Sequence, residues 1–199
     1  MNNVVITRSK NQILDISEMI TQLGMNPVEF PCIEIDSSSY KDSLYGELTN
    51  LNTYDWILFT SRNTIQVLNE IILENQMDID WKKIKVGAIG PETKKMLINI
   101  FDVEHVFTPK IFNVKSFTDE LPIMPEEKIL VPQSKIADNS IVNNLQEKDI
   151  LVKKIIAYDL KVGTGGENVP KMLKEKTVDA VIFTSGSTVT NFVKRTYPE

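Results

Sequence analysis

The sequence predicts an α/β protein built on parallel sheets, with two similar lobes. Short apolar runs of strand character alternate with segments of helical period through most of the 199 residues, which is typical of βαβ units. Two strand-to-helix junctions share Phe-Thr-Ser, at 59–61 and 183–185, and so indicate an internal repeat. Apolar residues make up 42% of the chain and charged residues 25%, a balance that favours a packed globular core.

The first expected elements are a strand at 3–7 and a helix whose apolar face is Ile13, Ile16, Ile20 and Leu23, ended by Gly24. The segment 26–35 carries two prolines, so we expect a linker or an edge strand there. A polar helix should follow. Four strand–helix units then follow. We expect the strand and the helix of each unit, in that order, at 56–59 and 63–73, at 85–89 and 92–100, at 106 and 114–121, and at 129–131 and 138–145.

A second extended segment, 151–162, is too long for a typical parallel strand and could leave one domain and enter another. A glycine-rich turn at 163–166 separates it from a helix, a strand at 179–183 and a last helix that begins at Ser187.

Composition excludes several classes of function. The formal net charge of −5 argues against a nucleic-acid partner, and no apolar run reaches the roughly 20 residues that span a membrane. The N-terminal residues lack the features of a signal peptide, so we expect a cytoplasmic protein. Cys32 and His105 are the only residues of their types, which argues against a disulfide or a Cys/His metal cluster, and both are interpreted as structural. Dinucleotide and Walker phosphate motifs are absent from the sequence, so no cofactor or metal is expected.

The repeated Phe-Thr-Ser turns are the main candidates for binding. Each follows an apolar strand and precedes a helix, which puts hydroxyls and free helix N–H groups at the carboxyl edge of a parallel sheet, where carboxylates can bind. The alternative is a plain N-cap. The turn at 89–93, with Gly90 and Thr93, repeats the arrangement. Arg8 ends the first strand and is either a carboxylate clamp or a solvated side chain, whereas the three lysine pairs, Lys82-Lys83, Lys94-Lys95 and Lys153-Lys154, are expected to be solvated.

These motifs in this order resemble the uroporphyrinogen-III synthase family: Thr-Arg after the first strand, a proline-containing linker, Phe-Thr-Ser-x-Asn, Ile-Gly-x-x-Thr, a linker tyrosine and a second Phe-Thr-Ser. The resemblance covers almost the whole chain. It implies two flavodoxin-like domains, 1–35 with 161–199 and 36–155, joined by a two-stranded ladder at about 28–36 and 153–162, with the active site in the cleft between them.

The resemblance also implies a reaction that needs neither cofactor nor metal. Hydroxymethylbilane, a linear tetrapyrrole, would lose its hydroxyl and close through a spiro-pyrrolenine with inversion of ring D, as a step of haem biosynthesis. The protein would be a cytoplasmic monomer in transient contact with the enzyme that makes this substrate. Tyr158 is the implied catalytic residue, assisting departure of the hydroxyl. The implied substrate-binding residues are Thr7, Arg8, Ser61, Asn63, Gly90, Thr93, Thr184, Ser185 and Ser187.

Two departures from the family pattern bear on the site. Pro132-Gln133-Ser134 stands where the family often has Arg-Gly, and the second lobe has no counterpart of the turn at 89–93. The second lobe is therefore expected to be shortened or truncated, which would expose core surface and favour lower stability or dimer formation. Two other classes of function stay open on the residues alone. One is a non-enzymatic bilobed sensor of a small anion, and the other is a flavodoxin-like interaction domain.

Overall fold

The structure of the chain is a computed structural model that describes residues 2–197, apart from the side chains at positions 11 and 15. It divides into two compact units. Unit 1 combines Met1–Asp36 with Leu160–Glu199, and unit 2 is Ser37–Asp159. Within the described part, none of the helices combines the length and the apolar character needed to cross a membrane.

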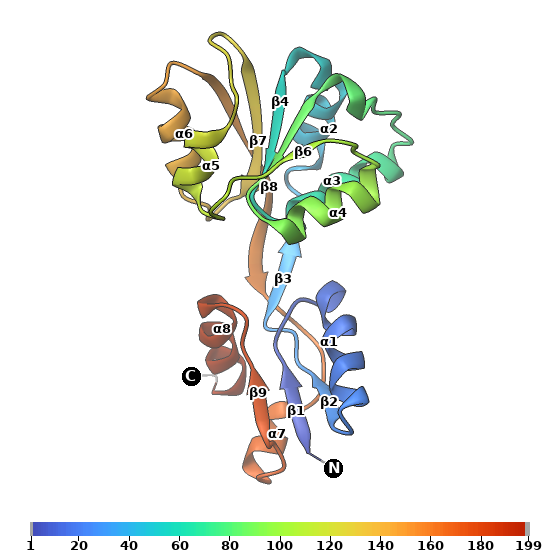
Figure 1. Cartoon of the computed structure of the whole chain (residues 1–199). Coiled ribbons are helices and arrows are strands. Elements are labelled where there is room, and N and C mark those ends of the chain that lie inside the picture. The colour runs from blue at the N-terminus through green and yellow to red at the C-terminus, as the bar shows by residue number, and fades with distance from the viewer. Residues whose placement is uncertain (1, 198–199) are drawn as a thin grey trace. The chain divides into compact units, whose positions relative to one another are not determined.

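Unit 1 is a three-stranded parallel sheet between helices (Figure 1). Residues of β1 alternate between its two faces: Val5 packs with α7 and α8, whereas Val4 and Ile6 pack with α1. The strand order is β2-β1-β9. The elements of this unit are β1 (Asn3–Ile6), α1 (Lys10–Gln22), β2 (Asn26–Glu29), β3 (Ile33–Asp36), α7 (Val169–Lys174), β9 (Ala180–Ile182) and α8 (Gly186–Thr196).

Two expectations for unit 1 need correction. Leu23 was expected on the buried face of the first helix but is 71% exposed, because it caps α1 and Gly24, at φ 75°, turns the chain away immediately after it. The linker strand was expected from about 28. Residues 26–29 form β2, which pairs with β1 at the edge of the sheet and there tolerates Pro27, so the edge-strand alternative is confirmed for them. The linker strand, β3, begins only at Ile33.

Unit 2 is a parallel sheet with helices on both faces. Helices α5 and α6 lie on one side and α2, α3 and α4 on the other (Figure 1). The elements are α2 (Lys41–Thr49), η1 (Leu51–Thr53), β4 (Trp56–Phe59), α3 (Arg62–Glu74), η2 (Trp81–Lys83), β5 (Lys85–Ala88), α4 (Pro91–Phe101), β6 (Val106–Phe107), α5 (Val114–Glu120), β7 (Lys128–Ser134), α6 (Ser140–Gln146) and β8 (Leu151–Val162). The 12-residue β8 runs from unit 2 into unit 1, and β3 is its other neighbour in the sheet order.

The strand order of unit 2 corrects the flavodoxin-like expectation. The order β8-β7-β4-β5-β6 is 5-4-1-2-3 in chain sequence, which is a doubly wound order with the first strand in the middle rather than the flavodoxin order 2-1-3-4-5. The difference comes from the connection after β6, which returns past β4 to place β7 on its far side. The direction of winding therefore changes between β4 and β7, and open α/β sheets bind ligands at the carboxyl ends of strands beside such a switch point.

Candidate active site

A pair of hydroxyls lies at the carboxyl edge of the unit 2 sheet. Ser61 follows β4 and caps α3, where its Oγ accepts a hydrogen bond from the N–H of Asn63 at 3.1 Å. The same Oγ lies 3.3 Å from the phenolic oxygen of Tyr158, which comes from β8 and is only 4% exposed. The structure thus brings together the expected catalytic tyrosine and an expected binding serine that is 97 residues away in the sequence.

The turn with Gly90 and Thr93 lies beside the Ser61 turn. Phe59 of β4 pairs with Ala88 of β5, so the two helices start at adjacent strand ends. Gly90 caps α4 with Pro91 as the first helical residue, and Thr93 in the first turn is buried. The N-termini of α3 and α4 therefore present two neighbouring sets of N–H groups at one edge of the sheet, the arrangement that favours binding of carboxylates.

Gln133 and Ser134 lie at the end of β7 beside the switch point, and neither was among the expected site residues. Ser134 is paired with Tyr158, and the register shifts between Gln133 and Ser134. Gln133 is 5% exposed, and its Oε1 has no hydrogen-bond partner among the described residues. The signal in the sequence was a polar residue close behind the apolar run at 129–131, but only the fold pairs the end of β7 with the part of β8 that carries Tyr158. Lys135 next donates its N–H to the carbonyl of Tyr158 at 2.8 Å, which fixes the backbone at the tyrosine.

Unit 1 has its own hydroxyl-bearing turn. Ser185 caps α8 in a reciprocal capping box with Thr188, and its Oγ lies 2.9 Å from that of Ser187. Thr184, just before it, is exposed. Thr7 on the neighbouring strand end is fully buried, and its hydroxyl donates to the carbonyl of Ile182 at 2.7 Å. Ser185 and Ser187 thus lie together at this edge. The Thr7 hydroxyl, in contrast, already donates its hydrogen bond to β9 and so holds β1 beside β9.

The other singled-out residues lie in varied surroundings. Arg8 is half-buried after β1, His105 is exposed, and Cys32 is fully buried, which raises the pKa of its thiol to about 11. Cys32 thus packs as expected. Among the described residues, the acidic, His and Cys side chains form no cluster of three or more arranged for a metal ion.

The arrangement at the unit 2 edge can bind anions and donate hydrogen bonds. The phenol of Tyr158 and the hydroxyl of Ser61 are both possible donors to an oxygen atom, and the helix N-termini add backbone N–H groups. An ion pair between Arg62 and Glu92, at 4.0 Å, joins the two turns.

Comparison with known proteins identifies the family. A sequence model described as uroporphyrinogen-III synthase HemD matches residues 15–198. The chain belongs to the uroporphyrinogen-III synthase family. This membership confirms the resemblance found in the sequence and favours a synthase over an anion sensor or an interaction domain.

Relatives within the synthase family differ in length from this chain. A putative uroporphyrinogen-III synthase of Methanocaldococcus jannaschii is 31% identical over 196 residues, which cover 96% of this chain and 77% of that protein. A porphyrin biosynthesis protein HemD of Ruminiclostridium josui is 30% identical over 96% of this chain but only 38% of its own length. The chain thus spans well under half of one curated relative and about three quarters of another.

Solved synthase structures share the fold. A mutant uroporphyrinogen III synthase from the extremely thermophilic bacterium Thermus thermophilus has a TM-score of 0.61 at 16% identity, with 98% of this chain and 77% of that chain covered. The uroporphyrinogen-III synthetase of Helicobacter pylori gives 0.59 at 18% identity, with 97% and 78% covered. The α/β fold with parallel sheets is therefore that of known synthases.

Proposed function

We propose that this chain is a uroporphyrinogen-III synthase, which closes hydroxymethylbilane into a ring with inversion of ring D. Membership of the family carries the proposal. The hydroxyl pair of Ser61 and Tyr158 supports it, because the reaction begins with loss of a hydroxyl group and needs a donor beside the departing oxygen.

The proposed chemistry is an elimination followed by two bond-forming events. The terminal hydroxyl leaves as water with one added proton, and the remaining azafulvene is attacked by the substituted carbon of ring D. The spiro-pyrrolenine so formed fragments at the other bond of that carbon and recloses with ring D turned over. Ring D then loses the hydrogen of its newly bonded carbon as a proton, which balances the proton added to the hydroxyl, so the net change is loss of one water molecule. The protein has to supply one proton donor and hold the chain in one conformation.

We assign the donor role to Tyr158. Its hydroxyl is the polar end of an otherwise buried side chain, and Ser61 holds it at a hydrogen-bond distance of 3.3 Å. Ser61 is itself fixed by its capping bond to the N–H of Asn63, so the phenol is positioned by the start of a helix. The turns with Gly90 and Thr93, and in unit 1 with Arg8, Thr184, Ser185 and Ser187, are proposed to bind side-chain carboxylates of the substrate. Thr7, whose buried hydroxyl donates to Ile182, is proposed to hold this edge in place rather than to bind.

We further propose that the two compact units are two domains, linked by β3 and β8. The division into Met1–Asp36 with Leu160–Glu199, and Ser37–Asp159, supports it. The protein is proposed to act in the cytoplasm as a monomer, in transient contact with the enzyme that supplies its substrate. Light scattering after size exclusion tests the monomer: a mass near twice the 22.6 kDa of the chain would contradict it.

The deciding experiment supplies hydroxymethylbilane made enzymatically in the same vessel and resolves the cyclic products after oxidation. Without a synthase, the substrate closes to the type I isomer, so heat-denatured protein provides the background. We expect the type III isomer to exceed that background in proportion to the protein added. Formation of the type I isomer alone would refute the proposed function for this chain.

A further inference from the structure

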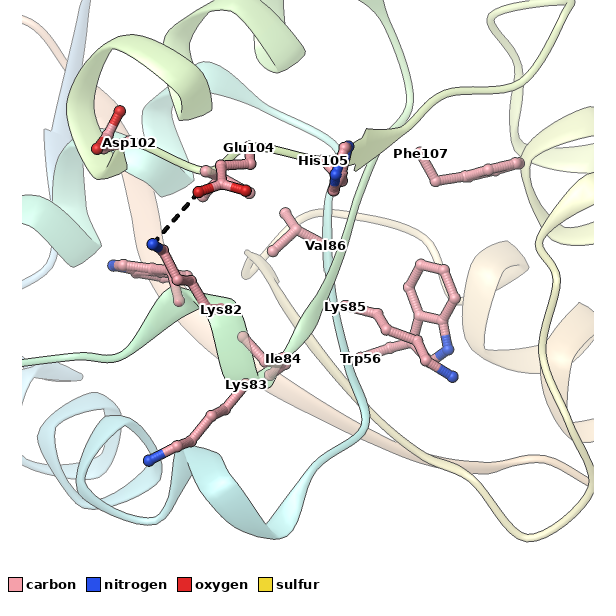
Figure 2. Close-up of a pocket in the computed structure, with 12 residues that line it drawn as sticks. Trp56, Lys82, Lys83, Ile84, Lys85, Val86, Asp102, Glu104, His105 and Phe107 are labelled. Atoms are coloured by element: carbon pink, nitrogen blue, oxygen red, sulfur yellow. Dashed lines mark ion pairs between the residues drawn. The ribbon is translucent and has the colours of Figure 1, made fainter.

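A cavity of about 510 Å³ opens at the amino-terminal edge of the unit 2 sheet, the edge opposite to the turns described above. It is lined by the first residues of β4 and β5, by η2 and by the connection from α4 to β6 (Figure 2). Tyr158 and Ser61 are not among its lining residues. The volume falls in the range of small-molecule sites.

The cavity exists because β6 is short. Only Val106 and Phe107 belong to this strand, and they pair with Val86 and Gly87 of β5. Lys85 at the start of β5 therefore has no partner in β6. Asp102 ends α4 at φ 52°, in the left-handed region, and the following residues enter β6 without covering the first part of β5. A space bordered by two loops remains at this corner of the sheet.

The walls of the cavity are apolar and aromatic, and charged groups surround them. Both tryptophans of the chain, Trp56 and Trp81, line it together with Phe107. Among the charged lining residues, lysines outnumber acids by three to two: Lys82, Lys83 and Lys85 against Asp102 and Glu104. In Figure 2 the Lys82 and Glu104 side chains point toward each other beside the cavity. Flat apolar groups fit such walls, and a lysine that can leave its present partner could pair with a negative charge on the ligand.

The lysines differ in how firmly their present partners hold them. Lys82 lies 3.3 Å from Glu104 and Lys83 lies 3.2 Å from Asp80, and in both pairs the side chains are more than half exposed. Exposed pairs of this kind contribute little and reorient easily. Lys85 is held more firmly, because it pairs with the largely buried Glu127 and lies 5.5 Å from the centre of the Trp56 ring. Lys82 and Lys83 are therefore the cations available to a ligand.

We propose that this cavity is a second binding site, for a small molecule that joins a planar apolar ring system to one carboxylate or sulfonate group. The rings lie against the indole of Trp81, which is stacked on Phe101 at 4.4 Å, and the anion replaces Glu104 as the partner of Lys82. The site is independent of the proposed cyclisation, because it lies at the other edge of the sheet and shares no residue with it.

The two tryptophans make the proposal directly testable. Each tryptophan gives one indole N–H signal in a nitrogen-15 correlation spectrum of the whole chain. Because both tryptophans line the cavity, both signals report on this site. We expect titration with naphthalene sulfonate to shift both signals saturably. Neutral naphthyl methyl sulfone, of similar size, should bind at least about fivefold more weakly, and the affinity of the sulfonate should fall between about 0.1 M and about 1 M salt.

Three variants test the charge recognition. Lys82→Gln with Lys83→Gln should weaken sulfonate binding about fivefold or more, whereas Lys94→Gln with Lys95→Gln removes the same charge from α4 and should leave it unchanged. Glu104→Gln should strengthen binding, since it removes the competitor for Lys82. Unshifted indole signals, equal binding of the neutral sulfone, or equal effects of the two lysine pairs would each overturn the proposal. The spectrum also reports whether each variant is folded, and none of these outcomes depends on synthase activity.

Discussion

In Tyr158 the role of the hydroxyl can be tested separately from the packing of the ring. The ring is buried, and the hydroxyl contacts that of Ser61, so Tyr158→Phe should preserve the packing and remove only the donor. We expect formation of the type III isomer to fall about a hundredfold or more, the range of general acid catalysis, at a cost in stability of about 1 kcal/mol. Product analysis with enzymatically supplied hydroxymethylbilane measures the first effect and urea unfolding the second.

A matched control for this substitution is Tyr54→Phe. The Tyr54 hydroxyl donates to Glu47, and burial with this neighbouring carboxylate raises the pKa of the phenol. Removing it should lower stability without changing the ratio of isomers. If both Phe variants kept full activity, Tyr158 would not be the donor, although the proposed synthase function would stand.

Cys32 gives a prediction about alkaline pH. Burial raises the pKa of its thiol from 9.0 to about 11, so the folded state holds the proton more tightly than the unfolded chain. The stabilisation from this group is complete below about pH 9 and is lost as the pH rises toward 11. The size of this contribution is about 3 kcal/mol. The free energy of unfolding should therefore decline less steeply over this range in Cys32→Ala than in the original chain.

Comparing the two proteins isolates this thiol, because the other titrating groups are common to both. Cys32→Ala also loses packing, so its stability should already be lower at about pH 8; the informative quantity is the slope with pH. Parallel curves for the two proteins would show that Cys32 does not titrate differently in the folded state.

At the level of residues, the sequence predicted positions better than contacts. Ser61 and Ser185 could be assigned to helix starts because a cap depends on neighbours within three residues. The contact between Ser61 and Tyr158 spans 97 residues and depends on the order of strands, which no local pattern contains. Gln133 was missed for the same reason: its burial follows from the pairing of β7 with β8, where it lies opposite Ile156.

Among the elements, the end of β8 offers a test of close backbone packing. A Cβ on Gly163 would overlap the carbonyl oxygen of Pro31 and come within 2.8 Å of the backbone nitrogen of Ile33, and Gly163 donates its own N–H to the carbonyl of Cys32. Both sides of this contact are backbone, so neither can move without displacing β3 or β8. Gly163→Ala should destabilise the protein by about 2 kcal/mol or more, measured by urea unfolding.

Gly46 is the matched control for that substitution. It lies inside α2, and a Cβ there would meet no atom within 4 Å. Gly46→Ala should stabilise the chain by about 0.5 to 1 kcal/mol through helix propensity. If the Gly163→Ala protein were as stable as Gly46→Ala, the backbone at Pro31–Ile33 would be able to move aside at little cost, contrary to the expectation.

Elements with uniform burial were the ones the sequence predicted well. All four residues of β4 are buried, and the helices after β4 and β5 begin within about a residue of the expected places, because apolar runs and turn residues agreed. Leu23 was misplaced because helical period alone does not show that Gly24 ends the buried stripe one turn early. The edge strand β2 was partly assigned to the linker because Pro27 and Pro31 suit either role.

For the whole molecule, the parallel α/β architecture was predictable but the strand order of unit 2 was not. Alternating strands and helices require parallel pairing and crossovers, whichever way the sheet is wound. Whether the chain after β6 continues outward or returns past β4 depends on which apolar surface of the sheet α5 packs against. Here Phe117 and Leu121 pack with Trp56 and Ile129, on the face shared by β4 and β7. That choice creates the switch point beside Tyr158, so the site depends on a long-range feature.

The free energy of local opening should differ between the sheets of the two units, and amide hydrogen exchange of the whole chain can measure this difference. In unit 2, Ile57 of β4 pairs with Leu130 and has a strand on either side, and both side chains are almost completely buried. In unit 1, β1 is the one sheet neighbour of β9 among residues 2–197, and Ala180 is exposed. Amides of β4 should therefore exchange slowest and those of β9 much faster, because local opening of β9 exposes little apolar surface.

The second edge strand of unit 1 separates the effect of burial from the effect of position. β2 also pairs only with β1, but its Val28 is 2% exposed and packs in the core with Phe30 and Val169. We expect exchange in β2 to be slower than in β9 and faster than in β4. Equal rates in β2 and β9 would show that edge position alone controls opening; equal rates in all three strands would show that the chain opens only as one cooperative unit, with the two units unfolding together.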